Sequence, residues 1–404
     1  MSERFLLPVG LKDYRTQDVK KIDFVSSIFL DEAEVWGYKK ILTPIFEKLD
    51  SLEVGTKQEE VPNIIKFIDP LNGDVLGIRS DVTPQIARYI ATNYKEESSP
   101  FRLCYIERVV RNQSKDIRNK REIFQVGCEL IGSDEIESDL EIILLPSRIL
   151  NKLGFDRQTI TLNSSLFLNF IFSKLPTIKE KIAPLFHKKD FDSIKKFLKD
   201  RKLPKKEGDF LKNYVVPLIS QKSVNIKGLP AKVQNELKKV EFLSDSLKSL
   251  NPNLNVAIDL LDVKDFSYYS NITFDIAIPG ANQIVVSGGR YNELIKKYGK
   301  NLPAIGFGIN ILPLLAKIDY KDLGIPVVVI EHSIPKNLSL SFEARDFFNS
   351  QGFVCILSNQ KNQYKGEFDI RVKVNNNQSI DLYNKSNKKT GNYKTLSQLK
   401  EEEL

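Results

Sequence analysis

The chain contains few residues of the kinds on which many catalytic and metal sites depend. It has three cysteines in 404 residues, and no two of them stand in a CxxC pair. This spacing predicts neither a disulfide framework nor a zinc site, and we expect no bound metal. There are only two histidines, His187 and His332, and neither lies near a nucleophile motif. A histidine-based acid–base mechanism or catalytic triad is therefore not expected.

Long apolar segments are also absent. No run approaches the roughly 20 apolar residues that cross a bilayer, and the chain start, MSERFLLPVG, lacks the apolar core of a signal peptide. We therefore expect a cytoplasmic protein that does not associate with membranes. With 41% hydrophobic and 28% charged residues, the composition is typical of a globular protein of roughly two to three domains.

The charge balance is positive, with a formal net charge of +8. The lysines are spread along the chain, and the densest basic run, residues 188–206, has the spacing of a solvated helix face. Positive charge alone supports only non-specific attraction to nucleic acid. Nucleic acid is therefore not an expected partner.

The N-terminal region combines a helical pattern with a strand pattern. Apolar residues recur at helical spacing over residues 15–36, and residues 38–47 (YKKILTPIFE) form a predicted strand that contains Pro44. Proline lacks a backbone donor, so this strand belongs at a sheet edge or at an interface. A helix followed by such a strand suits either a two-fold dimer interface or an ordinary edge strand, and the pattern favours neither.

A short hairpin comes next, with predicted strands at 64–69 and 75–78 around the turn Asn72-Gly73. It leads directly to Pro84, which suits the first turn of a helix. Asp81 and Thr83 are thus expected at a helix N-terminus. There they either cap the helix or face a ligand.

The longest hairpin joins predicted strands at 101–111 and 122–132. Because side chains alternate between the two faces of a strand, Gln125, Gly127 and Glu129 share one face. An amide, a bare glycine and a carboxylate make a poor core surface but a suitable floor for a small polar ligand. Arg111, at the end of the first strand, can place a guanidinium beside this floor. The alternative is an ordinary solvated sheet face.

The segments that follow predict more helix and then further strands. Residues 138–153 form a predicted helix, residues 163–250 a lysine-rich helical insertion, and strands resume at Val256. Tyr268 and Tyr269 precede another strand and can wall a pocket with rings and hydroxyls.

A strand at 283–287 ends at Gly288-Gly289, where the backbone can approach a ligand closely, and Arg290 is expected to begin a helix. The composition changes near residue 324, and the remainder predicts a small α/β domain with a polar tail over 384–404. We place the core at 1–322 and the C-terminal domain at 323–404.

Over roughly residues 5–320 these segments, in this order, resemble the core of the class II aminoacyl-tRNA synthetases, and within them the histidyl-tRNA synthetase branch. Residues 38–47 resemble motif 1 and residues 102–132 resemble motif 2. IRSDVTPQIAR resembles that branch's amino-acid loop, and SYYSNITFD and SGGRYNEL resemble its histidine-specific and glycine-rich segments. The resemblance implies an α+β fold, in which helices flank an antiparallel sheet and the core carries a helical insertion.

The same resemblance implies a pocket for free histidine. Asp81, Thr83 and Gln125 would hold the α-ammonium, and Arg111 the carboxylate. Glu129 and Tyr268, supported by Tyr269, would bind the imidazole. Charge-assisted hydrogen bonds suit a zwitterion, and neutral imidazole needs one donor and one acceptor. Further residues expected to line this pocket are Lys264, Gly288, Gly289 and Arg290.

The sequence departs from the synthetase pattern where ATP would be clamped. Motif 3 should carry an arginine, but this chain reads GFGINILPLL, with Pro313 or a neighbour in that place. Asn112-Gln113 replaces the adenine-facing glutamate of motif 2, and Lys264 replaces an arginine without offering the same bidentate fork. Losing oriented charge at a phosphoryl transition state costs orders of magnitude in rate. We therefore expect histidine binding without adenylation.

A retained histidine pocket with a broken ATP clamp resembles the regulatory subunits of ATP phosphoribosyltransferase. This resemblance implies a non-catalytic protein without a cofactor, which joins a short catalytic subunit at the first step of histidine biosynthesis. Histidine would be its effector for feedback inhibition, and a homodimer would form within the hetero-oligomer. Two other functions suit the same fold: an active histidyl-tRNA synthetase, and a synthetase paralogue that acts as a tRNA-binding scaffold.

Overall fold

The computed structural model describes residues 6–56, 61–94, 99–112, 121–196, 203–220, 228–263, 268–320, 324–332, 337–359 and 363–401. Contacts between residues divide the chain into two units, Met1–Asp319 and Tyr320–Leu404. The boundary predicted from composition lies three residues later, at 322. Each unit is described by itself.

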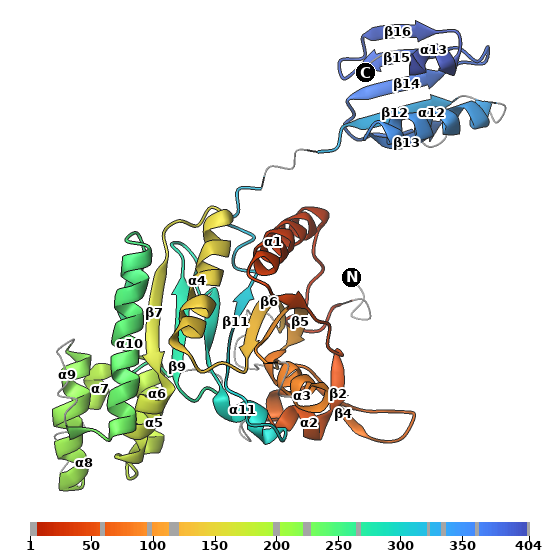
Figure 1. Ribbon diagram of the computed structural model, residues 1–404. Coiled ribbons are helices and arrows are strands. Elements are labelled where there is room, and N and C mark those ends of the chain that lie inside the picture. The colour runs from red at the N-terminus through yellow and green to blue at the C-terminus, as the bar shows by residue number, and fades with distance from the viewer. Residues whose placement is uncertain are drawn as a thin grey trace. The chain divides into compact units, whose positions relative to one another are not determined.

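An eight-stranded sheet organises the first unit (Figure 1). Its strands lie in the order β1 (Lys39–Lys40), β5 (Phe101–Val110), β6 (Glu122–Ile131), β11 (Ala304–Asn310), β10 (Val286–Arg290), β9 (Ile272–Ala277), β7 (Thr159–Ser164) and β8 (Asn255–Ile258). The six inner strands pair antiparallel with one another, and the edge strands β1 and β8 pair in parallel with β5 and β7. The predicted α+β class with an antiparallel sheet is confirmed.

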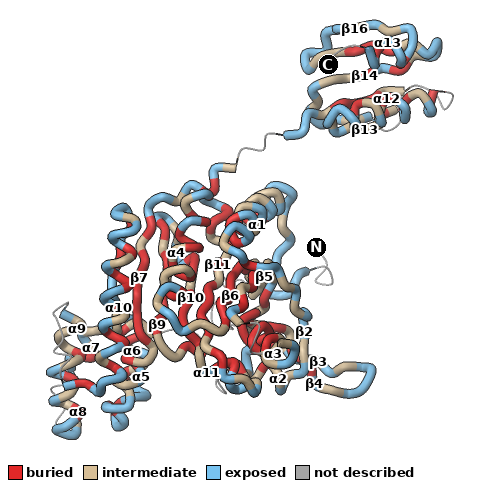
Figure 2. The backbone as a smooth tube through the Cα atoms, viewed as in Figure 1, coloured by how far each residue is buried: buried red, intermediate tan, exposed pale blue. Residues whose placement is uncertain are grey.

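Helices cover both faces of this sheet. On one face α1 (Thr16–Val35) packs on α4 (Ile136–Lys152), and α4 packs on α10 (Ala231–Leu250), so that α4 crosses the sheet between the other two (Figure 1). On the other face lie α3 (Thr83–Asn93) and α11 (Asn292–Lys297), which contact each other. Buried residues concentrate along the strands and on the helix sides that face them (Figure 2). This arrangement leaves the sheet face beside α3 and α11 available for a site.

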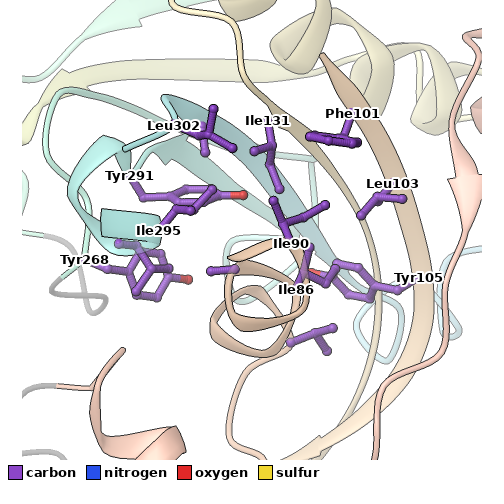
Figure 3. Packing of buried hydrophobic residues seen from close by; sticks show 14 of the residues in the cluster. Ile86, Ile90, Phe101, Leu103, Tyr105, Ile131, Tyr268, Tyr291, Ile295 and Leu302 are labelled. Carbon is purple, nitrogen blue, oxygen red and sulfur yellow. The ribbon is translucent and has the colours of Figure 1, made fainter. Parts of the chain in front are cut away.

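A core cluster under α3 holds this second face together. Ile86 and Ile90 are fully buried and lie between Tyr291 and Ile295 on one side and Leu103 and Tyr105 of β5 on the other (Figure 3). Pro84 occupies the first turn of α3, where its missing N–H costs nothing. The predicted helix after Pro84 is therefore confirmed, and it is anchored by packing on both sides.

A small three-stranded sheet supports α3 from the N-terminal side. Its order is β2 (Phe46–Lys48), β4 (Val75–Ile78) and β3 (Lys66–Ile68), and it is accompanied by α2 (Leu49–Glu53) and the 3-10 turn η2 (Val61–Asn63). The single strand predicted at 38–47 is wrong, because the chain leaves the large sheet after β1 and joins the small sheet at β2. The carbonyl oxygens of Thr43 and Pro44 accept hydrogen bonds from the side chains of Arg79 and Gln85, 3.0 and 2.8 Å away. They are therefore not available to a strand partner.

The helical insertion packs around an apolar cluster of its own. Its elements are α5 (Ser165–Ser173), α6 (Lys179–His187), α7 (Phe191–Lys196), α8 (Lys205–Phe210), the π-helical turn η5 (Leu211–Val215) and α9 (Val216–Ile219). The last helix of the region, α10, contacts β7, β8 and α4 as well, so it joins the insertion to the sheet.

The second unit is a five-stranded sheet with helices. Its order is β13 (Val354–Asn359), β12 (Val327–His332), β14 (Ile370–Val374), β15 (Ile380–Asn384) and β16 (Lys389–Tyr393), and its helices are α12 (Leu338–Ser350) and α13 (Leu396–Lys400). The predicted polar tail over 384–404 is wrong. β16 pairs with β15, and Leu396 and Leu399 of α13 are buried in the apolar cluster of this unit.

None of the helices described by the structure is long and apolar enough to cross a membrane.

Candidate ligand-binding site

A cavity of about 570 Å³ lies against the sheet face that carries α3 and α11. Its walls come from the N-terminal end of α3, the end of β5, the strands β6, β11, β10 and β9, and the segment before β9. The residues predicted to bind a ligand all line it: Asp81, Thr83, Arg111, Gln125, Glu129, Tyr268 and Tyr269. Tertiary structure thus brings together residues that are separated by up to 188 positions in the sequence.

The floor of the cavity depends on glycines in the neighbouring strand. Gln125 and Glu129 of β6 project from the face predicted by strand alternation, and Gly306 and Gly308 of β11 lie beside them. A Cβ at Gly306 would stand 1.7 Å from Glu129 Oε2, and one at Gly308 would stand 2.2 Å from Gln125 Nε2. The bare backbone of β11 therefore makes room for the two polar side chains of β6.

Glu129 lies at the inner end of this floor and is 1% exposed. Its Oε1 accepts a hydrogen bond of 2.6 Å from the Thr83 hydroxyl, and its Oε2 accepts one from the Tyr291 hydroxyl. Burial raises the pKa of Glu129 to about 8, although both hydrogen bonds act in the opposite direction. Near neutral pH this carboxyl can therefore either give a proton to a ligand or accept one from it.

This raised pKa makes the stability of the ligand-free protein depend on pH. The folded state holds the Glu129 proton up to a pH near 8, whereas the unfolded chain releases it near the ordinary value of 4.5. The stabilisation is complete below that ordinary value and is lost as pH rises through about 8. We expect Glu129 to lower the free energy of unfolding by up to about 1.4 kcal/mol per pH unit between the two pKa values, and Glu129→Gln to make the fall less steep.

Urea unfolding of the ligand-free protein from pH 5 to pH 9 measures this dependence. Glu122→Gln, at the other end of the same strand and outside the cavity, serves as the control and should keep the slope of the parent protein. Parallel curves for Glu129→Gln and the parent protein would contradict the expectation.

A second pair of hydrogen-bonded side chains lies beside the first. The hydroxyl of Tyr268 donates to Asp81 Oδ2, and the backbone N–H of Val82 donates to Oδ1 at 2.8 Å. Burial raises the pKa of Asp81, and the positive charge of Arg111 opposes the rise. The rings of Tyr268 and Tyr269 are 5.0 Å apart, and the ring of Tyr291 packs edge-on against Tyr268 at 5.9 Å. Tyr268, Tyr269 and Tyr291 thus form a tyrosine wall, and the Tyr268 hydroxyl of this wall binds Asp81.

Gln125, which lines the cavity, has a buried acceptor. Its Nε2 donates to the Tyr105 hydroxyl at 3.1 Å, while its Oε1 is buried and has no hydrogen-bond partner among the residues that the structure describes. An unmade hydrogen bond of a buried acceptor costs about 1–3 kcal/mol. The position of Oε1 therefore suits a ligand that brings an N–H donor.

Arg111 brings positive charge to the cavity. Arg111 follows β5, and its Nε donates to the carbonyl oxygen of Ser80 at 3.1 Å. Ser80 directly precedes Asp81, so this bond holds the guanidinium near Asp81. Among the described residues that line the cavity, Arg111 is the single lysine or arginine. In the described parts of the chain, no three His, Cys, Asp or Glu side chains are grouped as a metal site requires.

The predictions for the glycine pair and Arg290 need correction. Gly288, Gly289 and Arg290 belong to β10 and are not among the residues that line the cavity. A Cβ at Gly288 would meet the Phe274 ring at 2.5 Å, so this glycine serves close packing within the sheet. Arg290 ends the strand instead of beginning a helix, and its guanidinium points to the N-terminal end of α4. Lys264 lies outside the described residues.

Comparison with known proteins identifies the family. A family model described as histidyl-tRNA synthetase matches residues 10–314. The ATP phosphoribosyltransferase regulatory subunit of Geobacter sulfurreducens is 30% identical over 319 residues, which cover 78% of this chain and 73% of that protein. The chain belongs to the ATP phosphoribosyltransferase regulatory subunits. The equally named protein of Syntrophotalea carbinolica is 28% identical over 366 residues, 87% of this chain and 84% of that protein.

Solved structures agree with this family at the level of the fold. A structure from Bacillus halodurans, titled an ATP phosphoribosyltransferase regulatory subunit/histidyl-tRNA synthetase, has a TM-score of 0.74, 23% identity, and coverage of 88% of this chain and 93% of that one. Apo histidyl-tRNA synthetase of S. aureus has a TM-score of 0.67 at 19% identity, with coverage of 98% and 99%. The predicted family, a regulatory paralogue built on a class II synthetase fold, is confirmed.

The cavity lining also includes residues that set this regulatory-subunit chain apart from the synthetase pattern. Leu312 and Pro313 line it at the place where motif 3 predicts an arginine. Nearby, the Ser287 hydroxyl donates to Asp275 Oδ1 at 2.7 Å. Neither leucine nor proline can bind a phosphate through its side chain, which agrees with the expected loss of the ATP clamp.

Several residues of the site were not predicted from the sequence. Tyr291, which binds Glu129, lies in the segment SGGRYNEL, and its sequence context predicts no contact with the ligand. The same is true of Gly306 and Gly308 in GFG. Gly306 and Gly308 alternate along β11 as Gln125 and Glu129 alternate along β6. This matching alternation is the sequence signal that places the glycines on the same sheet face. Further lining residues not assigned from the sequence include Asp275, Ser287, Asn310, His187 and Asp262.

Proposed function

We propose that this chain is a histidine-binding regulatory subunit that controls a short ATP phosphoribosyltransferase catalytic subunit at the first step of histidine biosynthesis. Histidine binds in the cavity and inhibits the complex. The family supports the regulatory role, because the relatives in Geobacter and Syntrophotalea carry this name. The observation that carries the choice of ligand is the cavity itself. Its described lining combines buried carboxyl groups, tyrosine hydroxyls, one guanidinium and an amide oxygen without a partner among the described residues.

The chemistry of the cavity matches each part of a histidine zwitterion. Asp81 and the free Oε1 of Gln125 accept from the ammonium, and Thr83 lies between Asp81 and Glu129 to complete this end. Arg111 pairs with the carboxylate. Glu129, whose pKa of about 8 lies close to neutrality, exchanges a hydrogen bond with one imidazole nitrogen, and Tyr268 with Tyr269 bounds the ring.

The same proposal includes a homodimer and a cytoplasmic location. The segment from the end of β1 to the start of β2 exposes apolar side chains, with Leu42 74%, Ile45 55% and Phe46 46% exposed. Adjacent exposed apolar side chains are typical of a protein–protein interface, and this segment is the one that resembles motif 1. We propose no nucleic-acid partner, because the net positive charge is spread along the chain.

The test is inhibition of the reconstituted complex with a short catalytic subunit. Histidine should inhibit the parent complex, and Asp81→Ala should raise the histidine concentration for half-inhibition by at least about 10-fold, because a buried charge-assisted bond to the ammonium is lost. Asp74→Ala serves as the control, because Asp74 is only half-buried and pairs with Lys48 outside the cavity. Equal sensitivity of Asp81→Ala and the parent complex would refute the assignment of the pocket.

A further inference from the structure

Arg290 is an almost fully buried guanidinium that ties together two segments of the site. It is 1% exposed, and its Nε donates to Asp139 Oδ1 at 2.6 Å. Its Nη1 donates to the carbonyl oxygen of Ser133 at 2.9 Å, and its Nη2 to that of Glu135 at 3.0 Å. A buried charge persists only where such partners compensate for lost hydration. The position of Arg290 is therefore strongly determined.

These contacts connect both partners of the hydrogen bond that orients Glu129. Tyr291, whose hydroxyl donates to Glu129, directly follows Arg290 in the chain. Ser133 and Glu135, whose carbonyl oxygens bind Arg290, follow the end of β6, the strand that carries Glu129. Displacement of the guanidinium would therefore release both the segment that carries Tyr291 and the segment that follows the strand of Glu129.

The cluster reaches the helical insertion through Asp139. This carboxylate is fully buried on α4, and its second oxygen, Oδ2, lies 2.6 Å from Nζ of Lys239 on α10. The side chain of Lys239 is 22% exposed, so the ion pair runs from the surface of the insertion to the interior. One carboxylate oxygen of Asp139 thus pairs with Lys239, and the other pairs with Arg290.

A second contact from the same helix reaches the segment behind the tyrosine wall. Glu236 lies one turn before Lys239 on α10, and its Oε2 accepts a hydrogen bond of 3.2 Å from Nδ2 of Asn271. Asn271 follows Tyr269 by two residues and immediately precedes β9. Residues three apart on a helix share one face, so one face of α10 contacts both Asp139 on α4 and the segment that carries Tyr268 and Tyr269 of the cavity.

We infer that Lys239 is a positioning residue for the amino-acid cavity, and that α10 acts through Asp139, Arg290 and Tyr291 on the orientation of Glu129. The inference rests on the proposed binding of histidine. Lys239 does not line the cavity, so its effect on a ligand passes through this chain of buried contacts. The helical insertion is thereby coupled to the site of the effector.

Calorimetric titration of the full-length protein with histidine tests this coupling. Lys239→Met should weaken histidine binding about 3- to 10-fold, a size typical of coupling through residues that do not touch the ligand. Lys239→Arg, which keeps the charge, should bind within about twofold of the parent protein. Lys152→Met is the matched control, because Lys152 on α4 forms an ion pair with the buried carboxylate of Glu32 away from the cavity.

A double-mutant cycle separates positioning from general loss of stability. In a Tyr291→Phe background the hydroxyl that links Arg290's segment to Glu129 is gone, and Lys239→Met should then change affinity less than about twofold. An undiminished effect of Lys239→Met in that background, or unchanged affinity of Lys239→Met alone, overturns the coupling and leaves the proposed function standing. A parent protein that does not bind histidine overturns both.

Discussion

Glu129→Ala is expected to weaken histidine binding by at least about 100-fold, or about 2.7 kcal/mol. The substitution removes the carboxyl group that we propose to bind the imidazole. It also leaves the hydroxyls of Thr83 and Tyr291 without the acceptor they share in the buried floor. A buried polar group that loses its hydrogen-bond partner costs about 1–3 kcal/mol, and two such groups are left here, so the effect should exceed that of any exposed substitution.

Calorimetry on Glu129→Ala and on Glu122→Ala compares two glutamates of the same strand. Glu122 begins β6 and pairs with Arg108 at 3.4 Å outside the cavity, so its removal should change affinity less than about twofold. Binding by Glu129→Ala within fivefold of the parent protein would show that this carboxylate does not contact the ligand.

Gly306→Ala is expected to abolish histidine binding and to lower the free energy of unfolding by about 2 kcal/mol or more. A Cβ at this position stands 1.7 Å from Glu129 Oε2 and 2.7 Å from the carbonyl oxygen of Cys128. The carboxylate could rotate away, but the carbonyl oxygen belongs to the neighbouring strand and is fixed by the ladder between β6 and β11. One added methyl group therefore displaces Glu129 and strains the sheet.

Two alanine variants calibrate this result. Gly308→Ala meets the side-chain Nε2 of Gln125 at 2.2 Å, and because this side chain can move, a smaller loss of stability is expected than for Gly306→Ala. Gly208→Ala in α8 has its nearest neighbour at 3.6 Å and should be neutral or stabilising, since alanine favours a helix. Unfolding in urea and titration with histidine provide both measurements. Normal histidine binding by Gly306→Ala would refute the packing argument.

The features predicted correctly from the sequence are those set by local chemistry. The apolar period of α1, the turn at Asn72-Gly73 and the position of Pro84 each act within a few residues of the chain. The alternation of β6 likewise determined which side of the strand carries Gln125 and Glu129, because neighbouring residues of a strand must face opposite ways. These signals sufficed to place Gln125 and Glu129 on the sheet face that lines the cavity.

The errors arose where non-local partners decide the structure. The carbonyl oxygens near Pro44 bind Arg79 and Gln85, which divides a continuous strand pattern into β1 and β2. β10 continues through Gly288-Gly289 because β9 and β11 pair with it on both sides, although glycine is a poor strand residue. Leu396 and Leu399 are too few to predict a helix in a polar segment, yet they bury against the second unit's core.

The amino-acid sequence by itself determined the class of the fold, the face of β6 that bears the polar residues, and the absence of an arginine in motif 3. Only the tertiary structure decided that Tyr291 binds Glu129, that Gly306 makes room for it, and that Arg290 turns away from the cavity toward Asp139. The physical reason is the range of the interactions. Helix period and strand alternation act along the chain, whereas a buried charge takes whichever partners the packed sheet and helices bring within reach.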